Sequence, residues 1–270
     1  MNETLLARLA KEFNFREKYL LRLIRSAPFR YKVYRIEKRQ EGKYRTIAQP
    51  AVEAKMLQYF IINNYLVNLP VHPSATGYVR KQNIKSNASL HARNQFLLKM
   101  DFVDFFPSIK PDDLFTYLAK TKENTLRKDD FPLVRDILFW CPKWSKTGDL
   151  ELSIGAPSSP LVSNLVMFEF DKKMNRLCKG LNIAYSRYAD DLTFSTNERH
   201  ILESVHKRIE KICEQWKHPT LRINREKTVF SSKKHRRRIT GLIITNKSEI
   251  SLGRDRKRLV RESWYNEFRQ

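Results

Sequence analysis

The 270-residue sequence lacks several features that would assign it to a common class of protein at once. It has only three cysteines and no Cys-x-x-Cys pair, which predicts neither a disulfide framework nor a zinc site. No apolar run approaches the ~20 residues that cross a membrane, and residues 1–8 lack the hydrophobic block of a signal peptide. Internal repeats, low-complexity segments and Gly/Ser linkers are also missing. These absences favour one connected body in the cytoplasm.

Acidic residues are scarce relative to basic ones. The chain has 52 Lys and Arg against 29 Asp and Glu, which gives a formal net charge of +23. Positive charges in such excess repel one another, and a polyanionic partner would relieve this repulsion. Nucleic acid is the first candidate for that partner, and the alternative is a merely soluble basic protein. Because the basic residues are spread along the chain, we expect the folded surface to bind nucleic acid and the affinity to fall steeply with salt.

The apolar pattern predicts a mixture of helices and strands. Helices are expected over residues 3–25 with a break near Asn14, and over residues 52–67, 161–177, 198–217 and 253–270. Residues 31–47 predict two strands joined by a turn at residues 40–42. Lys38 and Arg45 on this hairpin either protect a solvated edge or bind phosphates, and the pattern leaves both interpretations open.

One carboxylate stands at the end of the strand predicted for residues 96–101. The apolar residues at even positions would face one side of that strand, and Asp101 would face the other. Apolar residues surround Asp101, and a carboxylate in such a place is costly unless a metal or another cation compensates it. We therefore expect Asp101 to have a functional role.

Two adjacent aspartates, Asp190 and Asp191, lie between two runs of strand character in residues 183–195, which predicts a hairpin with carboxylates at its tip. An Asp-Asp pair in a turn is by itself usually structural. Together with Asp101 on a neighbouring antiparallel strand, however, the pair would repel unless hard cations joined the three groups. Two Mg²⁺ ions roughly 3.5–4 Å apart would stabilise attack of a 3′-hydroxyl on a phosphoryl group. With a basic surface, this arrangement predicts a template-directed nucleotidyl transferase.

Five sequence blocks follow one another along the chain: LKMDFVDFFPSI, GAPSSP, SRYADDLTFS, INREKT and RRITGL. Their order over residues 38–242 resembles that of reverse transcriptases, with YADD at residues 188–191 as the diagnostic tetrapeptide. Within that family, NASLH at residues 87–91 and ITGL at residues 239–242 resemble blocks of bacterial retron reverse transcriptases. The resemblance implies an α+β right-hand polymerase fold with an antiparallel palm sheet, fingers and a short or truncated helical thumb.

The resemblance also implies a division of the chain: an N-terminal helical extension (residues 1–30), fingers (31–94), a palm (95–245) with a fingers insertion at about 110–152, and the start of a thumb (246–270). Two departures from the family stand out. Ile154 replaces the glutamine that commonly precedes the glycine of GAPSSP. The thumb segment is shorter than retron enzymes usually have, which predicts poor processivity.

Roles for individual residues follow from the resemblance in three sets. The catalytic set comprises the metal carboxylates Asp101, Asp190 and Asp191, the Phe102 carbonyl as a further metal ligand, and Lys227, which would stabilise or protonate pyrophosphate. The nucleotide-binding set comprises Lys38 and Arg45 at the triphosphate, Phe106 under the sugar, where it excludes a 2′-hydroxyl, and Gly155, Ser159 and Pro160 around the pocket. The RNA-binding set comprises Asn87, His91, Thr240, Gly241, Arg254, Lys257 and Arg258.

The partners implied by the resemblance are two Mg²⁺ ions, dNTP substrates and a noncoding RNA that serves as template and primer. They also include a branched RNA–DNA product and an effector protein in defence against phage, with no membrane partner. Two alternatives stay open: another bacterial reverse transcriptase of the group II intron, diversity-generating or abortive-infection type, and an RNA-binding scaffold that keeps a polymerase fold. The presence of Asp101, Asp190 and Asp191 together argues against the scaffold, because a protein that only binds RNA would bind the phosphates more tightly without these negative charges.

Overall fold

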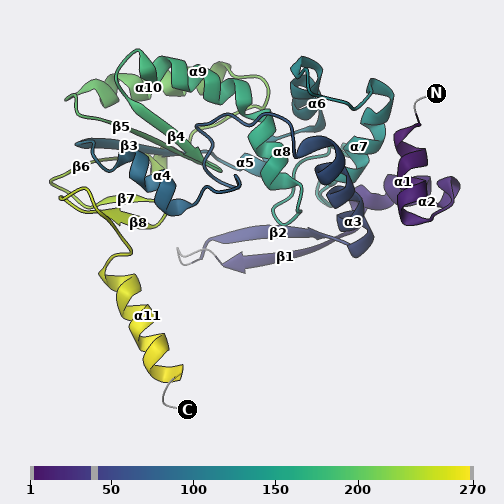
Figure 1. Cartoon of the computed structure of the whole chain (residues 1–270), viewed down its shortest axis with the longest axis horizontal. Helices are drawn as coiled ribbons and strands as arrows, with labels where there is room; N and C mark the ends of the chain where they lie inside the picture. Colours follow the sequence, from purple (N-terminus) through teal and green to yellow (C-terminus); the bar gives the residue numbers. More distant parts are fainter. Residues whose placement is uncertain (1–2, 38–41, 268–270) are drawn as a thin grey trace. The chain divides into compact units, whose positions relative to one another are not determined.

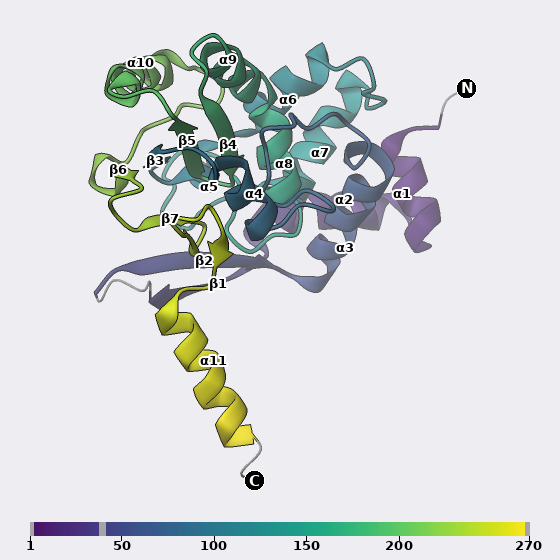
Figure 2. The same cartoon turned by 60° about the vertical axis from the view of Figure 1, so that its left-hand side comes forward.

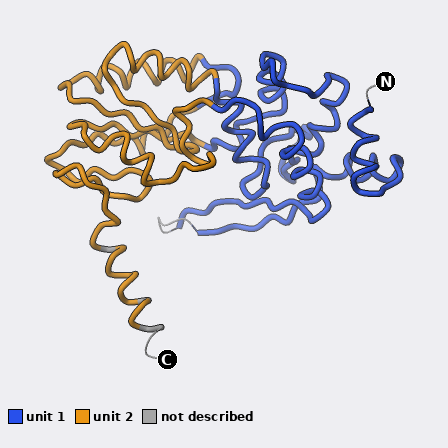
Figure 3. Tube along the Cα trace, viewed as in Figure 1, with its two compact units in different colours: residues 1–71, 104–168, 216–221 blue, residues 72–103, 169–215, 222–270 orange. Residues whose placement is uncertain are grey.

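The computed structural model describes residues 3–37 and 42–267, and it divides into two compact units (Figure 1, Figure 3). Unit 1 contains residues 1–71, 104–168 and 216–221, and unit 2 contains residues 72–103, 169–215 and 222–270. Within the described part of the chain, the strands of every sheet pair in antiparallel fashion. Helices and antiparallel sheets together give the α+β class that the sequence predicts.

Unit 1 is mainly helical and has one two-stranded hairpin. Its helices are α1 (Leu5–Phe13), α2 (Glu17–Ser26), α3 (Val52–Ile61), α5 (Phe105–Ser108), α6 (Pro111–Lys120), α7 (Phe131–Leu138) and α8 (Ser159–Val166), with the short turns η1 (Ala27–Phe29), η2 (Ile62–Leu66) and η3 (Lys128–Asp130). Strands β1 (Tyr31–Glu37) and β2 (Tyr44–Pro50) form the hairpin. Asn14 ends α1 with a left-handed φ of 51°, at the break that the sequence predicts.

Unit 2 contains a four-stranded sheet of order β4-β5-β3-β6 and a three-stranded sheet of order β7-β8-β9. The strands are β3 (Phe96–Asp101), β4 (Ala184–Tyr188), β5 (Asp191–Thr196), β6 (Val229–Ser232), β7 (Arg237–Ile239), β8 (Leu242–Ile244) and β9 (Ile250–Ser251). The helices are α4 (Ile84–His91), α9 (Phe168–Lys179), α10 (Ile201–Gln215), η4 (Arg225–Lys227) and α11 (Arg254–Glu267). None of the helices in the described ranges is long and apolar enough to cross a membrane.

Helices cover both faces of the four-stranded sheet in unit 2 (Figure 1, Figure 2). Helices α9 and α10 cover the face that holds the fully buried Leu98, Leu192 and Phe194. Helix α4 lies on the opposite face and also packs against β7 and β8. The apolar cluster formed by α4, β3, β7 and β8 comprises Ala88, Ala92, Leu97, Ile239, Leu242 and Ile244. The sheet is therefore a central layer, with its two faces held by different helices.

Two elements differ from the sequence-based expectations. The helix expected over residues 161–177 is divided into α8 and α9, which are separated at Met167. Helix α4 was not expected, because its sequence is polar and has no apolar stripe. Its start is instead set by a capping box, in which the Asn83 side chain accepts from Ser86 N and Ser86 Oγ accepts from Asn83 N.

Candidate active site

Asp101 and Asp191 lie opposite each other on the two central strands of the larger sheet. Strands β3 and β5 pair with Asp101 in register with Asp191. Directly opposed residues of an antiparallel pair share a face, with Cβ atoms about 4.5–5.5 Å apart. Asp190 lies in the turn between β4 and β5, and its carbonyl accepts a hydrogen bond from Phe102 N at 3.3 Å. The strand end and the hairpin tip are therefore brought together, as the sequence predicts.

Positive charges surround the opposed carboxylates. Lys227 Nζ donates to both carboxylate oxygens of Asp101, at 2.9 and 3.0 Å, and Asp101 is only 6% exposed. Burial raises the pKa of Asp191 to about 6, and the nearby positive charge of Lys99 opposes that rise. The negative charges of Asp190 and Asp101 raise the pKa of Asp191 further. The three acids therefore repel one another, and the two lysines partly compensate the repulsion.

The donor chemistry of this site suits a hard divalent cation. Carboxylate oxygens are the ligands such ions prefer, and an ion would relieve the repulsion among the three acids. The ammonium group of Lys227 already satisfies Asp101 in this structure. Among the residues of the two described ranges, no three His, Cys, Asp or Glu side chains are gathered closely enough to hold a metal ion. The assignment of Asp101, Phe102, Asp190 and Asp191 as metal ligands therefore stays a prediction.

A glycine far from the hairpin in the sequence lies directly against the hairpin turn. Gly77 is buried, and a Cβ at this position would lie 2.8 Å from Ala189 N and 3.2 Å from the Tyr188 carbonyl carbon. Ala189 itself has a left-handed φ of 57°. A side chain at position 77 would therefore displace the backbone that leads to Asp190. The sequence holds no signal for this contact, because residues 77 and 189 meet only in the folded chain.

Asn87 and His91 lie in the interior of unit 2. The His91 ring nitrogens lie 2.7 Å from Ser195 Oγ and 2.8 Å from Ser186 Oγ. Asn87 Oδ1 accepts from Ser186 Oγ at 2.6 Å and from Thr76 Oγ1 at 3.0 Å. Both Asn87 and His91 are 0% exposed, so in this structure their side chains bind α4 to the hairpin and do not reach the surface. Their expected contact with RNA stays a prediction.

The buried imidazole of His91 makes the stability of unit 2 depend on pH. Burial lowers the pKa of His91 from 6.5 to about 3, so the folded protein keeps this ring neutral while the unfolded chain binds a proton below pH 6.5. The contribution of the neutral His91 ring to the free energy of unfolding is therefore fully present above pH 6.5 and is lost as the pH falls from 6.5 toward 3. Between pH 7.5 and 5.5 we expect His91 to account for a loss on the order of 1 kcal/mol in the free energy of unfolding.

Urea unfolding of the wild type and of His91→Gln at the two pH values measures this contribution. The glutamine side chain can hydrogen-bond both serines but has no proton to gain in this range. The wild type should lose more stability than the variant on acidification. An equal loss in the two proteins would show that His91 is not the group responsible.

The remaining RNA-binding candidates lie near the C-terminal helix. Thr240 and Gly241 form the turn between β7 and β8, with φ values of 44° and 84°. A Cβ on Gly241 would lie 2.7 Å from Arg256 Nη2, so this glycine allows the guanidinium to approach. Three further candidates are exposed on α11 at the i, i+3 and i+4 spacing of one helix face: Arg254, Lys257 and Arg258.

The nucleotide-binding candidates that the structure describes lie in unit 1. Arg45 is exposed on β2, and Phe106 is half-buried in α5; Lys38 lies outside the described residues. Gly155 has a φ of 125°, and a Cβ there would lie 3.0 Å from Ile47 Cγ2. The neighbouring Ile154 accepts a hydrogen bond through its carbonyl from Ala48 N at 2.9 Å.

The GAPSSP segment therefore packs its backbone against β2, and small residues permit this close approach. Beyond this turn, Ser159 is buried at the start of α8, and Pro160 is half-buried at the next position. The expected roles of Gly155, Ser159 and Pro160 in a nucleotide pocket stay predictions.

Comparison with known proteins agrees with this arrangement. The family "Reverse transcriptase (RNA-dependent DNA polymerase)" matches residues 36–244. The chain is 44% identical to the retron Ec83 reverse transcriptase of Escherichia coli over 88% of this chain and 76% of that protein. It is 34% identical to the retron Ec73 reverse transcriptase of E. coli over 83% of this chain and 72% of that protein.

Solved structures show the same fold at low sequence identity. Apo telomerase from Candida tropicalis, truncated from its C-terminal domain, matches with a TM-score of 0.53 and 14% identity, over 88% of this chain and 60% of that chain. This likeness supports the fold alone, and with the family match it confirms the predicted right-hand polymerase architecture. The chain belongs to the retron-type reverse transcriptases, which are RNA-directed DNA polymerases.

Proposed function

We propose that this polymerase copies part of a partner noncoding RNA into single-stranded DNA by two-metal-ion nucleotidyl transfer with Mg²⁺ and dNTPs. The observation that carries the proposal is the register of β3 and β5, which sets Asp101 opposite Asp191 beside the turn that holds Asp190. The net charge of +23 supports a nucleic acid partner. Three relatives at 31–44% identity are retron reverse transcriptases, which supports a partner RNA of the retron kind.

Each residue of the site has a role in this proposal. Asp101, Asp190, Asp191 and the Phe102 carbonyl would hold the two ions, which would activate the attacking hydroxyl and neutralise the triphosphate. Lys227, which neutralises Asp101 in this structure, stabilises or protonates the leaving pyrophosphate. In the retron reaction the first attacking group is the 2′-hydroxyl of an internal guanosine, so that the DNA product stays joined to the RNA as a branch.

Residues of unit 1 bind the incoming nucleotide in this proposal. Lys38 and Arg45 contact the triphosphate, and Phe106 lies under the sugar, where it excludes a 2′-hydroxyl. Gly155, Ser159 and Pro160 shape the pocket. The hydroxyl of Ser159 is buried and has no hydrogen-bond partner in the described part of the chain, which supports a polar ligand for it.

Sequencing the nucleic acid that copurifies with the protein from cells tests the retron proposal. We expect one RNA species joined to DNA through a 2′–5′ branch. A population of random cellular RNA, with no branched species, would contradict the proposed partner RNA and the proposed branched product. Extension of a primer on an RNA template with Mg²⁺ and dNTPs tests the polymerase itself; tight RNA binding without incorporation would favour the scaffold alternative.

The basic face of α11 is expected to bind the RNA backbone. Replacing Arg254, Lys257 and Arg258 together with Gln should weaken RNA binding about equally for all sequences, because phosphate contacts carry no sequence information. It should also reduce the slope of log K against log salt by up to about 3, roughly one for each lost contact. Filter binding at several salt concentrations measures both quantities. An unchanged slope would show that this face does not contact RNA.

The retron proposal also covers the cellular compartment of the enzyme, its protein partner and its biological role. It places the reaction in the cytoplasm, with an effector protein as a further partner and defence against phage as its role. Affinity purification of the protein from its native host cells tests the effector. Recovery of the branched nucleic acid without any associated protein would contradict that part of the proposal.

A further inference from the structure

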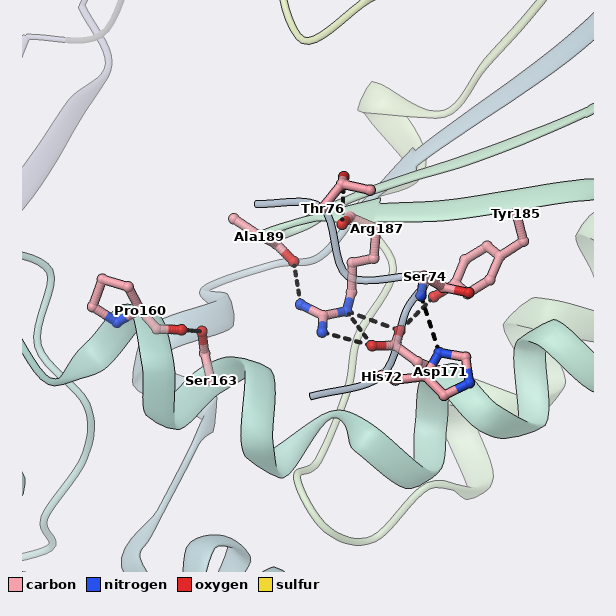
Figure 4. A network of polar contacts seen from close by, with 9 residues as sticks. All are labelled: His72, Ser74, Thr76, Pro160, Ser163, Asp171, Tyr185, Arg187 and Ala189. Atoms are coloured by element: carbon pink, nitrogen blue, oxygen red, sulfur yellow. Dashed lines mark hydrogen bonds and ion pairs between the residues drawn. The ribbon is translucent and has the colours of Figure 1, made fainter. Parts of the chain in front are cut away.

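A buried ion pair involves β4, the strand that leads to Asp190 and Asp191, and Figure 4 shows its two side chains, Arg187 and Asp171. Arg187 on β4 and Asp171 on α9 are both 0% exposed. Arg187 Nη2 donates to Asp171 Oδ2 at 2.7 Å, and Arg187 Nε lies 2.9 and 3.1 Å from the two carboxylate oxygens. Tyr185 adds a hydrogen bond from its hydroxyl to Asp171 Oδ1 at 2.7 Å. The carboxylate is therefore fully engaged and holds the guanidinium in one orientation.

The same guanidinium reaches the turn of the hairpin. Arg187 Nη1 donates to the Ala189 carbonyl at 3.1 Å, and that carbonyl belongs to the peptide bond that leads to Asp190 (Figure 4). A planar guanidinium can bind a carboxylate along one edge and a carbonyl with its remaining donors, whereas a lysine ammonium acts as a single point charge. Arg187 is thus the side chain that joins α9 to this turn.

The backbone of Arg187 is itself fixed. Arg187 N donates to Ser74 O at 2.8 Å, and Thr76 N donates to Arg187 O at 2.8 Å. Thr76 Oγ1 makes a further hydrogen bond to the Arg187 carbonyl at 3.1 Å (Figure 4). The guanidinium therefore extends from an anchored strand, and its contact with Ala189 restrains the turn relative to the rest of the sheet.

Stability alone does not explain this ion pair. The desolvation of two buried charges largely offsets their attraction, and apolar residues of similar volume often serve as well. Burial lowers the pKa of Arg187, but the charge of Asp171 and its hydrogen bonds raise it, so the group stays charged. A charged group kept at such a cost, with one donor on the catalytic hairpin, points to a role in the geometry of that hairpin.

We propose that Arg187 is a positioning residue for DNA synthesis: it fixes the turn through the Ala189 carbonyl and so sets the direction of the two following aspartates. Asp171 in turn holds the guanidinium in place. This inference rests on the proposed role of Asp190 and Asp191 as metal ligands. Loss of the contact should therefore weaken metal binding while the fold and the RNA-binding surface are retained.

Two variants of the pair test the proposal, because removing one charge alone leaves the other buried without a partner and can unfold the protein. Arg187→Lys keeps the positive charge opposite Asp171 but loses the planar guanidinium that binds both Asp171 and the Ala189 carbonyl. Arg187→Met combined with Asp171→Leu replaces the whole pair with apolar side chains. Both should weaken Mn²⁺ binding, followed by electron paramagnetic resonance on the protein without substrate, by about tenfold or more. The Mg²⁺ concentration for half-maximal primer extension should rise in parallel.

Tyr185→Phe is the matched control. It removes one hydrogen bond to the same buried carboxylate but leaves the contact with Ala189 in place. It should lower the melting temperature and leave Mn²⁺ binding and the Mg²⁺ midpoint unchanged. If the two pair variants behave like Tyr185→Phe, the pair is merely structural and the positioning role is wrong.

Asp190→Asn in the same Mn²⁺ assay separates failure of this inference from failure of the proposed function. Loss of Mn²⁺ binding in Asp190→Asn together with normal binding in the pair variants would overturn only the positioning role. Normal Mn²⁺ binding in Asp190→Asn would overturn the metal assignment on which the inference rests. Circular dichroism of each variant shows whether it is folded, and the double variant provides the test if Arg187→Lys is not.

Discussion

Replacing Asp190 with Asn is expected to reduce primer extension by about 10³-fold, while RNA binding stays as tight as in the wild type. The substitution keeps the shape of the side chain but removes the negative charge that binds a cation in the proposed mechanism. RNA binding depends instead on the positive surface of the chain, and removing one carboxylate does not weaken it. Primer extension on an RNA template and filter binding of the same RNA measure the two effects.

Glu203→Gln is the matched control for Asp190→Asn. Glu203 is exposed on α10, and its replacement by Gln changes the net charge by the same amount without touching the hairpin. Extension by this variant should equal that of the wild type. If Asp190→Asn loses RNA binding and extension to the same degree, the aspartate supports the fold, and its assignment to the chemistry is wrong.

Replacing Gly77 with Ala is expected to reduce primer extension by about 10²-fold, because the added methyl group needs the space that the hairpin turn occupies. The new Cβ would lie 2.8 Å from Ala189 N, a backbone atom that can move only with the turn. A displacement of about 1 Å at a reacting group is enough for a loss of this size. Overpacking should cost about 1–3 kcal/mol in the free energy of unfolding. Primer extension and urea unfolding measure the two effects.

Gly180→Ala provides the comparison for Gly77→Ala. At position 180 the nearest atom to an added Cβ is 3.7 Å away, which is ordinary van der Waals contact. This variant should keep wild-type extension and wild-type stability or gain slightly in stability. Full activity in Gly77→Ala would show that the turn tolerates displacement, and the close contact between Gly77 and Ala189 would then have no role in the reaction.

The two strands of the site were predictable because local patterns specify them. Alternation of apolar residues over residues 96–101 placed Asp101 on the face opposite Leu98 and Met100. The Asp-Asp pair between two strand-like runs placed Asp190 and Asp191 at a hairpin tip. The structure has both features, and the register of β3 and β5 places them side by side. The ordered blocks of the sequence indicated the family for the same reason, since each block is a short contiguous segment.

The supporting residues were not predictable in the same way, although a partial signal exists. Arg187 alternates with Ile183 and Tyr185 on the strand, so it belongs to the buried face and needs a partner there. Asp171 lies on the same helical stripe as the buried Met174 and Cys178. These positions mark two buried charges, but neither pattern says that the two meet or that Arg187 also reaches Ala189.

The structure also shows what Asn87 and His91 contact within unit 2. In the sequence they belong to a polar stretch that resembles a retron block, and the resemblance implies a contact with RNA, which stays a prediction. In the structure both are enclosed between α4 and the hairpin, because Ser186, Ser195 and Thr76 supply hydrogen-bond partners from distant segments. A polar side chain is buried when such partners exist, and only the folded chain provides them.

The sequence by itself determined the class of the fold, the hairpin that carries Asp190 and Asp191, the opposing strand and the family, since these depend on local periodicity and on contiguous motifs. Only the tertiary structure decided what holds the hairpin in place: Gly77 beneath the turn, the guanidinium of Arg187 on the Ala189 carbonyl, and the imidazole of His91 between two strands. Gly77 and His91 contact residues that lie about 100 positions away in the sequence. Arg187 and Ala189 are close in the sequence, but it is Asp171 on α9 that holds the guanidinium in place. Packing and hydrogen bonding between distant segments therefore set the geometry on which the proposed chemistry depends.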